Sequence, residues 1–452
     1  MSSAASAYAQ APPPSQPAGL PRLLAGVPAH GALSLQEHLE IHGEAPRKPR
    51  RRRRSESPLI ARIEAAGLLG RGGGAFPTAR KLRSVASAGR RPVVVVNAAE
   101  GEPASLKDRT LMRARPHLVL DGGELAASSL GAEEVIVCVC AGARASAEQA
   151  AAAIAERSRA GDSSSPRIRL QLVPNHYLSG QESALVSYLN GRRALPTFTP
   201  PLPFEQGVGR APTLVSNAET LAHLALIARH GPEWFRELGT PSEPGSALVT
   251  LSGPVAHPGV YEIELGAPLS SLIDAAGGAT DGVRAALVGG YAGSWIDAGR
   301  LPSLALSDEY LAQHRARLGA GVVLLLSEHA CPAAETARVA RWLASQSSGQ
   351  CGPCVNGLQA LAMTLTETAR GVARAKAEER IARLASLVQG RGACAHPDGA
   401  VEFILSAVQI FGSEFADHAR LGTCEACALA GELPIPDAAA RAHGGLRRAR
   451  LA

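Results

Sequence analysis

The residues with the clearest capacity for chemistry are cysteines. The chain has eight cysteines among 452 residues, and five of them lie between positions 351 and 427. Cys351 and Cys354 form a Cys-x-x-Cys pair, Cys394 follows further along the chain, and Cys424 and Cys427 form a second pair. Clustered cysteines in a long chain that shows no export signal indicate metal or redox chemistry rather than disulfides. Soft thiolates at this spacing are typical ligands of iron–sulfur clusters.

Zinc is the main alternative to iron at these cysteines. Two Cys-x-x-Cys pairs can hold a structural zinc ion, which needs four protein ligands. The two pairs here are separated by far more than the roughly 15–20 residues of a compact zinc ribbon, so we favour an iron–sulfur cluster. Cys138 and Cys140 alternate on a predicted buried strand and are expected in the core. Cys331 receives no role, and the thirteen histidines show no metal-ligand spacing.

A glycine-rich run between Gly67 and Thr78 is the most unusual segment of the chain. Glycines let the backbone approach a ligand closely, and successive N–H groups can face an anion. Lys81 follows and could place a point charge on a phosphate. Alone, the run could equally be a flexible linker, and it matches neither the P-loop nor a clean dinucleotide fingerprint. The loop is therefore a candidate phosphate site that needs support from other segments.

Three further polar segments supply that support. They are residues 97–103, directly after the apolar run 93–96, residues 177–185 and residues 212–221. Ligands of open parallel sheets bind at the carboxyl ends of the strands, where the first segment is expected. Each segment alone could be an ordinary helix cap. The four polar segments together, in this order, predict one cofactor site.

The elements that must position these residues change in character along the chain. Apolar, β-branched runs at 92–96, 133–140 and 168–173, with a helical stretch at 146–159, predict a parallel α/β sheet with crossover helices. Short strands at 247–253, 259–263 and 286–290 and a helix at 269–276 predict a small α+β module. Four amphipathic segments then predict a helical bundle, at residues 333–345, 352–369, 375–390 and 400–411.

Composition excludes several other classes of protein. The net charge is +6, and much of the excess lies in the arginine-rich run 47–54. No aromatic residue interleaves these arginines, so we expect a solvated, disordered arm over residues 1–57 rather than a nucleic-acid site. The first 18 residues do not resemble a secretory signal, and no apolar stretch reaches the roughly 18 residues of a membrane span. We expect a cytoplasmic protein that reaches a membrane only through partners.

The four polar segments resemble, in order and spacing, the flavin-binding motifs of the NADH-oxidising, FMN-carrying subunits of complex I. Related flavin subunits of NAD-linked formate dehydrogenases and hydrogenases share these motifs. The similarity spans about residues 60–412, and residues 251–255 and 288–293 resemble the SLBB-type β-grasp module of the same family. The resemblance implies an α/β fold with a Rossmann-like FMN-binding domain at 58–242, an SLBB-like domain at 243–332, a helical iron–sulfur domain at 333–440 and a tail at 441–452.

The same resemblance implies the site residues. The residues expected to line FMN are Gly70, Gly72, Gly73, Lys81, Asn97, Tyr177, Gly180, Glu182, Val215, Asn217 and Thr220. Phe76, Glu100 and Glu102 match positions that receive NADH, and Glu100 and Glu182 are the implied catalytic residues. The implied reaction passes hydride from NAD(P)H to FMN. Single electrons then go to a [4Fe-4S] cluster and on to a ferredoxin-like or complex-I-like partner.

Several positions depart from the family pattern. The family's aspartate before the Glu-Gly-Glu motif is Ala99, the first of two glutamates after Gly180 is Gln181, and one of two paired asparagines is Ser216. Family residues that contact the dinucleotide fall at Ser84, Thr199 and Leu202. The flavin site is therefore largely retained and the NADH site is eroded. One alternative is an FMN and iron–sulfur relay that has lost NADH oxidation and exchanges electrons with a ferredoxin-type partner. Another is a binding module without catalysis.

The cluster ligands also depart from the family pattern. The family uses three cysteines at two-residue spacing and a fourth downstream, and the first of the three falls at Ser348. Ser348 could bind iron through oxygen, or the cluster could have three protein ligands. Alternatively, Cys424 or Cys427 could fold back to complete the set. We favour this last outcome, because the second Cys-x-x-Cys pair is otherwise unexplained.

Overall fold

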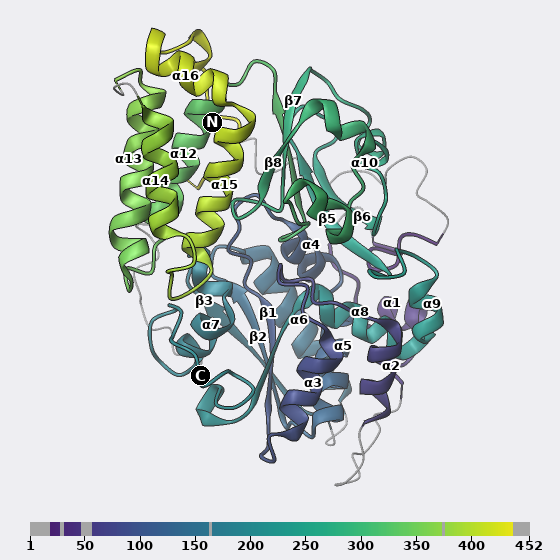
Figure 1. Cartoon of the computed structure of the whole chain (residues 1–452). Helices are drawn as coiled ribbons and strands as arrows, with labels where there is room; N and C mark the ends of the chain where they lie inside the picture. Colours follow the sequence, from purple (N-terminus) through teal and green to yellow (C-terminus); the bar gives the residue numbers. More distant parts are fainter. Residues whose placement is uncertain (1–18, 28–30, 47–56, 162–164, 373–375, 437–452) are drawn as a thin grey trace.

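The chain folds into three domains that pack against one another (Figure 1). The computed structural model describes residues 19–27, 31–46, 57–161, 165–372 and 376–436. An α/β domain forms one layer, and a β-sheet domain and a helical bundle lie side by side on it. The arginine-rich run 47–54 and the tail 441–452 lie outside the described residues.

A four-stranded parallel sheet is the centre of the first domain, with strand order β3-β2-β1-β4. Its strands are β1 (Val93–Ala98), β2 (Glu134–Cys140), β3 (Arg167–Val173) and β4 (Thr213–Asn217). Successive residues of β1 face opposite sides: Val94 belongs to one buried apolar cluster and Val95 to another. A strand buried on both faces must be apolar throughout, which explains the run of valines. The predicted parallel sheet is confirmed.

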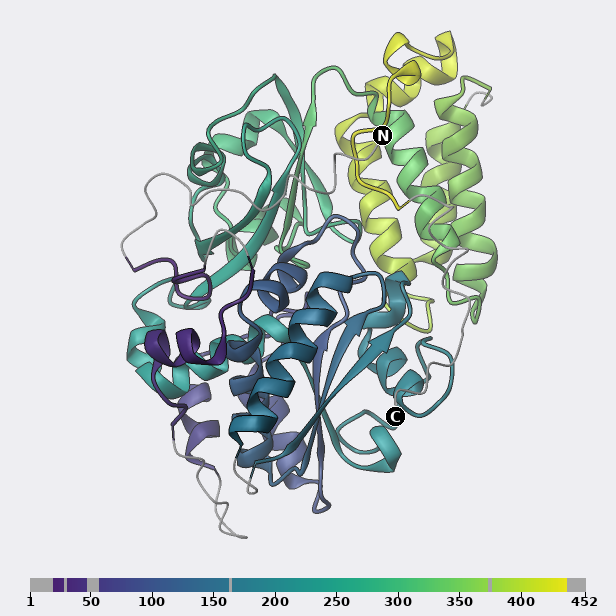
Figure 2. The same ribbon diagram turned by 180° about the vertical axis from the view of Figure 1, so that it is seen from behind.

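Helices connect and flank these strands (Figure 2). They are α2 (Pro58–Ala66), α3 (Thr78–Ser87), α4 (Lys107–Ala114), α5 (Pro116–Leu130), α6 (Arg144–Ala160), α7 (Glu182–Leu189), α8 (Ala218–His230) and α9 (Pro232–Arg236). In the register of the sheet, Asn97 near the end of β1 is paired with Asn217 at the end of β4. Two of the predicted polar segments therefore meet at one edge of the sheet.

Part of the predicted N-terminal arm is folded, which corrects the expectation for residues 1–57. Helix α1 (Leu35–His42) begins with a capping box between Ser34 and Glu37. His38 reaches Asp121 of α5 through Nε2 at 2.8 Å, and both side chains are buried. The fully buried side chain of Leu23 also joins the core of the α/β domain. These apolar and capping residues fix the segment despite the proline- and arginine-rich stretches beside it.

The second domain is a mixed five-stranded sheet with strand order β6-β5-β9-β7-β8. Its strands are β5 (Ser246–Ser252), β6 (Gly259–Glu264), β7 (Val283–Val288), β8 (Ser294–Asp297) and β9 (Val322–Ser327), with helices α10 (Leu269–Ala275) and α11 (Asp308–Leu311). The central pair of β5 and β9 is parallel, as in a β-grasp arrangement. Backbone N–H groups of this sheet bind carboxylates of the first domain: Leu248 donates to Glu219 at 2.8 Å and Tyr291 donates to Glu102 at 2.9 Å.

The third domain is a helical bundle, as predicted. It contains α12 (Pro332–Ser345), α13 (Leu358–Ala369), α14 (Ala377–Val388), α15 (His396–Ile410) and α16 (Gly412–Leu421). One π-helical turn, Pro353–Gly357, leads into α13 and carries Cys354. Such turns occur most often at functional sites. Within the described ranges no single helix is long and apolar enough to span a membrane, although α15 and α16, bent by 79°, pass that test as a pair.

Candidate cofactor sites

The four polar segments predicted to form one site do meet in space. Asn97 donates from Nδ2 to the carbonyl of Gly180 at 2.8 Å, and Asn217 donates from Nδ2 to the carbonyl of Asn97 at 3.4 Å. The glycine-rich loop joins them through the N–H of Arg71, which donates to Oγ1 of Thr220 at 2.8 Å. Residues from four distant parts of the chain thus converge at the carboxyl ends of β1 and β4, where parallel sheets bind ligands.

The glycine-rich loop is shaped by its lack of side chains. A Cβ atom on Gly72 would lie only 3.2 Å from Cβ of Asn217, whereas a Cβ on Gly74 would meet nothing within 4 Å. The N–H of Gly70 donates to the carbonyl of Phe76 at 2.9 Å and closes the loop at its base. Gly72, Gly73 and Gly74 are all exposed. The tip therefore presents bare backbone to the outside, as a ligand-contacting loop must.

Polar and aromatic side chains flank this backbone. Nζ of Lys81 lies 3.1 Å from a carboxylate oxygen of Glu182, and both side chains remain partly exposed. Phe76 is 49% exposed, and the Arg80 guanidinium lies 5.5 Å from its ring centroid. An exposed aromatic ring beside a cation and a carboxylate is available for stacking against a planar ligand. Val215, by contrast, is buried in the core beneath the sheet.

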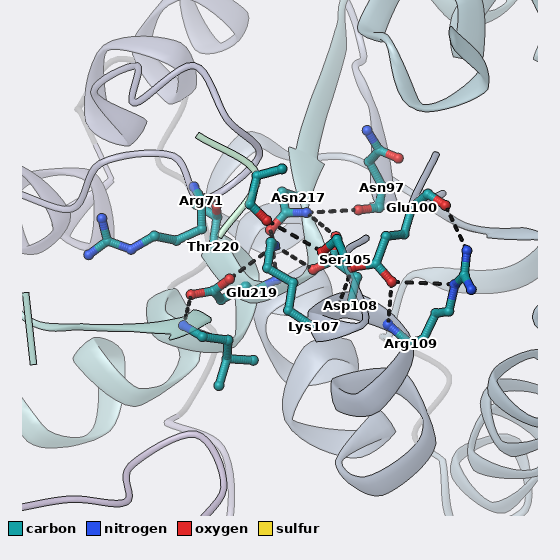
Figure 3. A network of polar contacts seen from close by, with 12 residues as sticks. Arg71, Asn97, Glu100, Ser105, Lys107, Asp108, Arg109, Asn217, Glu219 and Thr220 are labelled. Atoms are coloured by element: carbon teal, nitrogen blue, oxygen red, sulfur yellow. Dashed lines mark hydrogen bonds and ion pairs between the residues drawn. The ribbon is translucent and has the colours of Figure 1, made fainter. Parts of the chain in front are cut away.

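A buried charged network supports the loop from below (Figure 3). Nζ of Lys107 lies 2.8 Å from Asp108 and 3.0 Å from Glu219, and all three side chains are buried. Asn217 donates to Asp108 at 2.6 Å and accepts from the N–H of Glu219, so it also caps α8. Burial opposes the charge of Lys107, yet Asp108 and Glu219 raise its pKa above the ordinary value. This network fixes Asn217, one of the predicted flavin contacts.

Glu100 and Glu102 are placed inside the protein, which departs from the predicted contact with a dinucleotide. Glu100 accepts from the Ser105 hydroxyl at 2.6 Å and from the backbone N–H of Asp108 and Arg109. Glu102 accepts from the N–H groups of Ala104 and Tyr291. Burial raises the pKa of Glu102 to about 7, against the opposing effect of these donors. Their carboxylates join the first domain to its own helix α4 and to the second domain.

The space available to a ligand lies on the exposed side of the loop. On the inner side, Gly73, Lys107, Glu219 and Gly319 line a hollow of only ≈ 30 Å³ between the loop and the second domain. Small-molecule sites usually need about 300–1,000 Å³, so this hollow cannot hold a flavin. The exposed glycines, with half-exposed Asn97 and Asn217, instead form an open surface of backbone and amide groups. These groups fit a phosphorylated, planar cofactor such as FMN.

The predicted cluster cysteines also come together. Cys351, Cys354 and Cys394 carry free thiols, and the electrostatic interaction among all three affects their ionisation. Burial raises the pKa of Cys394, and the N–H of His396 opposes that shift. Burial acts on Cys351 too, but the N–H groups of Ala393 and Cys354 lower its pKa. Three thiols surrounded by N–H donors form a ligand set that fits an iron–sulfur cluster.

The fourth ligand is not a tail cysteine, which corrects the outcome favoured from the sequence. Sγ of Cys427 lies 3.4 Å from Sγ of Cys331, and Cys331 caps the beginning of α12. Cys351 and Cys354 follow the other end of α12, and a helix of 14 residues is about 21 Å long. The groups near Cys354 are instead the Ser347 hydroxyl and the N–H of Ser348. Oxygen ligation or a cluster with three protein ligands stays a prediction.

Tyr177 connects the two candidate sites. Its ring centroid lies 5.3 Å from that of Trp342 on α12 and 5.5 Å from that of His396, two residues after Cys394. Its backbone N–H donates to the side-chain oxygen of Gln346 at 3.1 Å. The same short helical turn, Tyr177–Gly180, ends at the carbonyl that binds Asn97. The flavin and cluster sites are therefore joined by one four-residue turn.

Sequence reasoning missed two sets of residues. Lys107 and Asp108 could have been found as adjacent charges in a segment whose apolar neighbours predict burial. Cys331 and His418 gave no spacing signal, because the fold alone brings them beside Cys427. Cys138 and Cys140 are buried in the core as predicted, and burial raises the pKa of Cys138 to about 12.

Three protein-family models match the chain. The Nuo51 FMN-binding domain matches residues 63–226, the SLBB domain matches residues 248–290, and the NADH-ubiquinone oxidoreductase-F iron-sulfur binding region matches residues 334–418. These matches follow the three domains of the structure in the same order. The candidate flavin segments lie within the first match, and Cys351, Cys354 and Cys394 lie within the third.

Individual relatives match most of the chain. An F-type NADH-quinone oxidoreductase chain of Rhizobium meliloti is 30% identical over 378 residues, which are 81% of this chain and 90% of that protein. The corresponding F-type NADH-quinone oxidoreductase chain of Streptomyces coelicolor is 31% identical over 378 residues, which are 80% of this chain and 82% of that protein. Among solved structures, a chain of an NAD+-reducing [NiFe]-hydrogenase in the H2-reduced state matches with a TM-score of 0.76 and 30% identity. That match covers 82% of this chain and 63% of the hydrogenase chain.

Proposed function

We propose that this chain, which belongs to the family of F-type NADH-quinone oxidoreductase chains, passes electrons from a reduced nicotinamide dinucleotide through FMN to a [4Fe-4S] cluster and on to a partner protein. When bound, FMN accepts a hydride and gives up single electrons, and the cluster carries one electron at a time. The acceptor is an electron-transfer protein of the same assembly. A membrane, if one is involved, is reached through such partners.

The observation that carries this proposal is the position of the Tyr177–Gly180 turn. Its Gly180 end accepts a hydrogen bond from Asn97 in the flavin site, and its Tyr177 end packs on His396 beside the cluster cysteines. A turn of four residues spans only about 13 Å even when fully extended. Two cofactors bound at its two ends would therefore lie close enough for electrons to pass between them without a mobile carrier.

The chain's own residues would bind and orient the flavin. The exposed backbone of Gly72, Gly73 and Gly74 offers N–H groups, and Lys81 offers a cation for a phosphate. Asn97 and Asn217 are held by the carbonyl of Gly180 and by Asp108, so their amides keep fixed orientations. Glu182, held by Lys81, is the partly exposed carboxylate closest in kind to a catalytic group at this surface.

A second candidate function is an electron relay that does not oxidise a nicotinamide. The specific observation is that both carboxylates expected to meet the dinucleotide, Glu100 and Glu102, are buried and bonded within the chain. Ser84, where the family has an aromatic residue, donates its hydroxyl to the carbonyl of Arg80. A relay of this kind would take electrons from a ferredoxin-type partner instead.

Anaerobic purification followed by redox titration tests the proposal. The full chain should carry close to one FMN and an iron–sulfur absorbance band, and NADH or NADPH should bleach both. Bleaching by reduced ferredoxin but by neither nicotinamide would favour the relay. A chain that binds neither flavin nor iron after anaerobic reconstitution would refute both proposals and leave a binding module. Gly72→Val, which crowds Asn217, should lose flavin and keep iron, with Gly74→Ala as the matched control on the open side of the loop.

A further inference from the structure

Four ligand atoms gather at the end of the helical bundle that lies away from the predicted cluster. The sulfurs of Cys331, Cys424 and Cys427 and a ring nitrogen of His418 all lie within 4.8 Å of one another. They come from three elements: Cys331 caps α12, His418 lies in the last turn of α16, and the two other cysteines flank the short turn Glu425–Ala428. Among the described residues, Cys351, Cys354 and Cys394 form no group this tight.

The distances within this group fit a single tetrahedral ion. Zinc binds sulfur at about 2.3 Å and imidazole nitrogen at about 2.0–2.1 Å, so tetrahedral ligand atoms lie about 3.5–3.8 Å apart. Sγ of Cys427 lies 3.6 Å from Cys424, 3.4 Å from Cys331 and 3.8 Å from Nε2 of His418. Cys331 lies 3.5 Å from the same nitrogen. A disulfide needs sulfurs about 2.05 Å apart, and a four-iron cluster holds its thiolates much farther apart than one ion does.

The surroundings of the group prepare these atoms as metal ligands. Nδ1 of His418 lies 3.0 Å from the carbonyl of Ala369, so this nitrogen carries the proton and donates it. Nε2, which faces the three sulfurs, is left with its lone pair, as in most histidines that bind metals. The N–H of Ala334 donates to Cys331 Sγ at 3.4 Å, and the N-terminal end of α12 favours a thiolate there.

We propose that Cys331, His418, Cys424 and Cys427 bind one Zn²⁺ ion as a structural site, separate from the iron–sulfur cluster. All four coordination positions are filled by the protein, which is the mark of a structural rather than a catalytic zinc site. Three thiolates and one imidazole are a ligand set that zinc commonly takes. The site requires nothing of the flavin or of Cys351, Cys354 and Cys394.

The site explains how the C-terminal segment is held. After Cys427 the chain runs along α12, where the Glu335 carboxylate accepts from the N–H groups of Glu432 and Leu433 at 3.1 Å. Leu433 is buried, and Tyr291 of the second domain donates its hydroxyl to the carbonyl of Pro434 at 2.7 Å. A zinc ion at the start of this segment would fix a strap that joins the bundle to the β-sheet domain.

Metal analysis of variants tests the zinc site. The full chain, expressed with both metals supplied, should contain close to one zinc per chain besides its iron. Cys424→Ser, at an exposed position, should lower zinc at least tenfold and leave iron unchanged, and Cys394→Ser should do the reverse. His329→Ala, at another exposed histidine, is the control that should change neither metal.

Two measurements on the unmodified chain keep the test decisive if a variant does not fold. Titration with a thiol-blocking mercurial should release one zinc equivalent to a chelating dye, and Co²⁺ in place of zinc should give the absorption of a tetrahedral thiolate complex. Proteolysis within residues 424–436 should increase after zinc is removed. A chain with its expected iron but less than a fifth of a zinc equivalent would overturn the proposal. So would zinc that is unchanged in Cys424→Ser, or a single iron lost from that variant in place of zinc.

Discussion

Replacing Lys107 with methionine should destabilise the α/β domain by about 3–5 kcal/mol, because removing one partner of a buried ion pair leaves the other charge uncompensated. Lys107 is 3% exposed and holds Asp108 at 2.8 Å and Glu219 at 3.0 Å. Methionine retains most of the apolar contact of the lysine stem, so the loss isolates the charge. Asp108 keeps its bond from Asn217 and Glu219 keeps its bond from Leu248, and neither donor carries a positive charge.

The pH dependence of this variant gives a second, independent sign. Burial already raises the pKa of Glu219, and loss of Lys107 removes the nearest charge that opposes the shift. A carboxyl group whose folded pKa is raised binds a proton more tightly in the folded state. Its contribution to stability is therefore present below its unfolded pKa near 4.5 and is lost as the pH rises. The deficit of Lys107→Met should accordingly be smaller at pH 5.5 than at pH 7.5.

Urea denaturation of the anaerobic protein, followed by far-UV circular dichroism at both pH values, measures these differences. Hydrogen exchange of peptides from α4 and α8 would locate the loss. The control is Arg91→Met, which breaks a pair with Glu133 whose side chains are 77% and 70% exposed and should lose less than about 1 kcal/mol. If Lys107→Met loses no more than this control at pH 7.5, the charges are screened by water and the reasoning is refuted.

Three other perturbations test separate parts of the structure. His117 accepts from Arg157 at Nδ1 and is neutral, and burial lowers its pKa to about 4, so the free energy of unfolding should fall by up to roughly 3 kcal/mol as the pH drops from 6.5 to 4. His117→Gln should flatten this dependence in urea melts, and an unchanged slope would contradict the assignment. Cys394→Ser should lose most of the iron, measured by metal analysis, and keep its flavin; iron at the level of the unmodified chain would exclude Cys394 as a ligand. Tyr177→Leu removes ring contacts with Trp342 and His396 and should cost about 1–3 kcal/mol of stability. In stopped-flow experiments it should slow cluster reduction while flavin reduction is unchanged, and equal rates would show that the turn is not the route.

The sequence was sufficient for the layers of the fold because burial and periodicity agree there. The valines of β1 and the apolar run of β2 are buried on both faces, so their patterns allow one interpretation. Strand β4 was harder, because it has only five residues and passes directly into the cap of α8 at Asn217. The helix at Leu35–His42 could have been predicted from its capping box, Ser34 and Glu37, had the neighbouring prolines and arginines been given less weight.

The candidate sites were predictable only where chemistry and chain order coincide. Gly72, Asn97, Gly180 and Asn217 follow strands or precede helices, so the sheet alone brings them together. Glu100 was expected at a ligand surface because its type and position suit one. Its actual role, accepting N–H bonds from Asp108 and Arg109, depends on how the chain turns into α4, which residue types do not reveal.

The length of α12 decides how the two groups of thiols divide their work. Cys331 caps its first turn, while Cys351 and Cys354 follow its last turn, beyond about 21 Å of helix. The far group lies beside Tyr177 and the flavin segments, and the near group lies beside the C-terminal strap. Zinc has no accessible redox change, so an ion held by Cys331 cannot take part in electron flow. Loss of the tail cysteines should therefore loosen the strap without slowing electrons between the flavin and the cluster, whereas a defect at Cys394 should do the opposite.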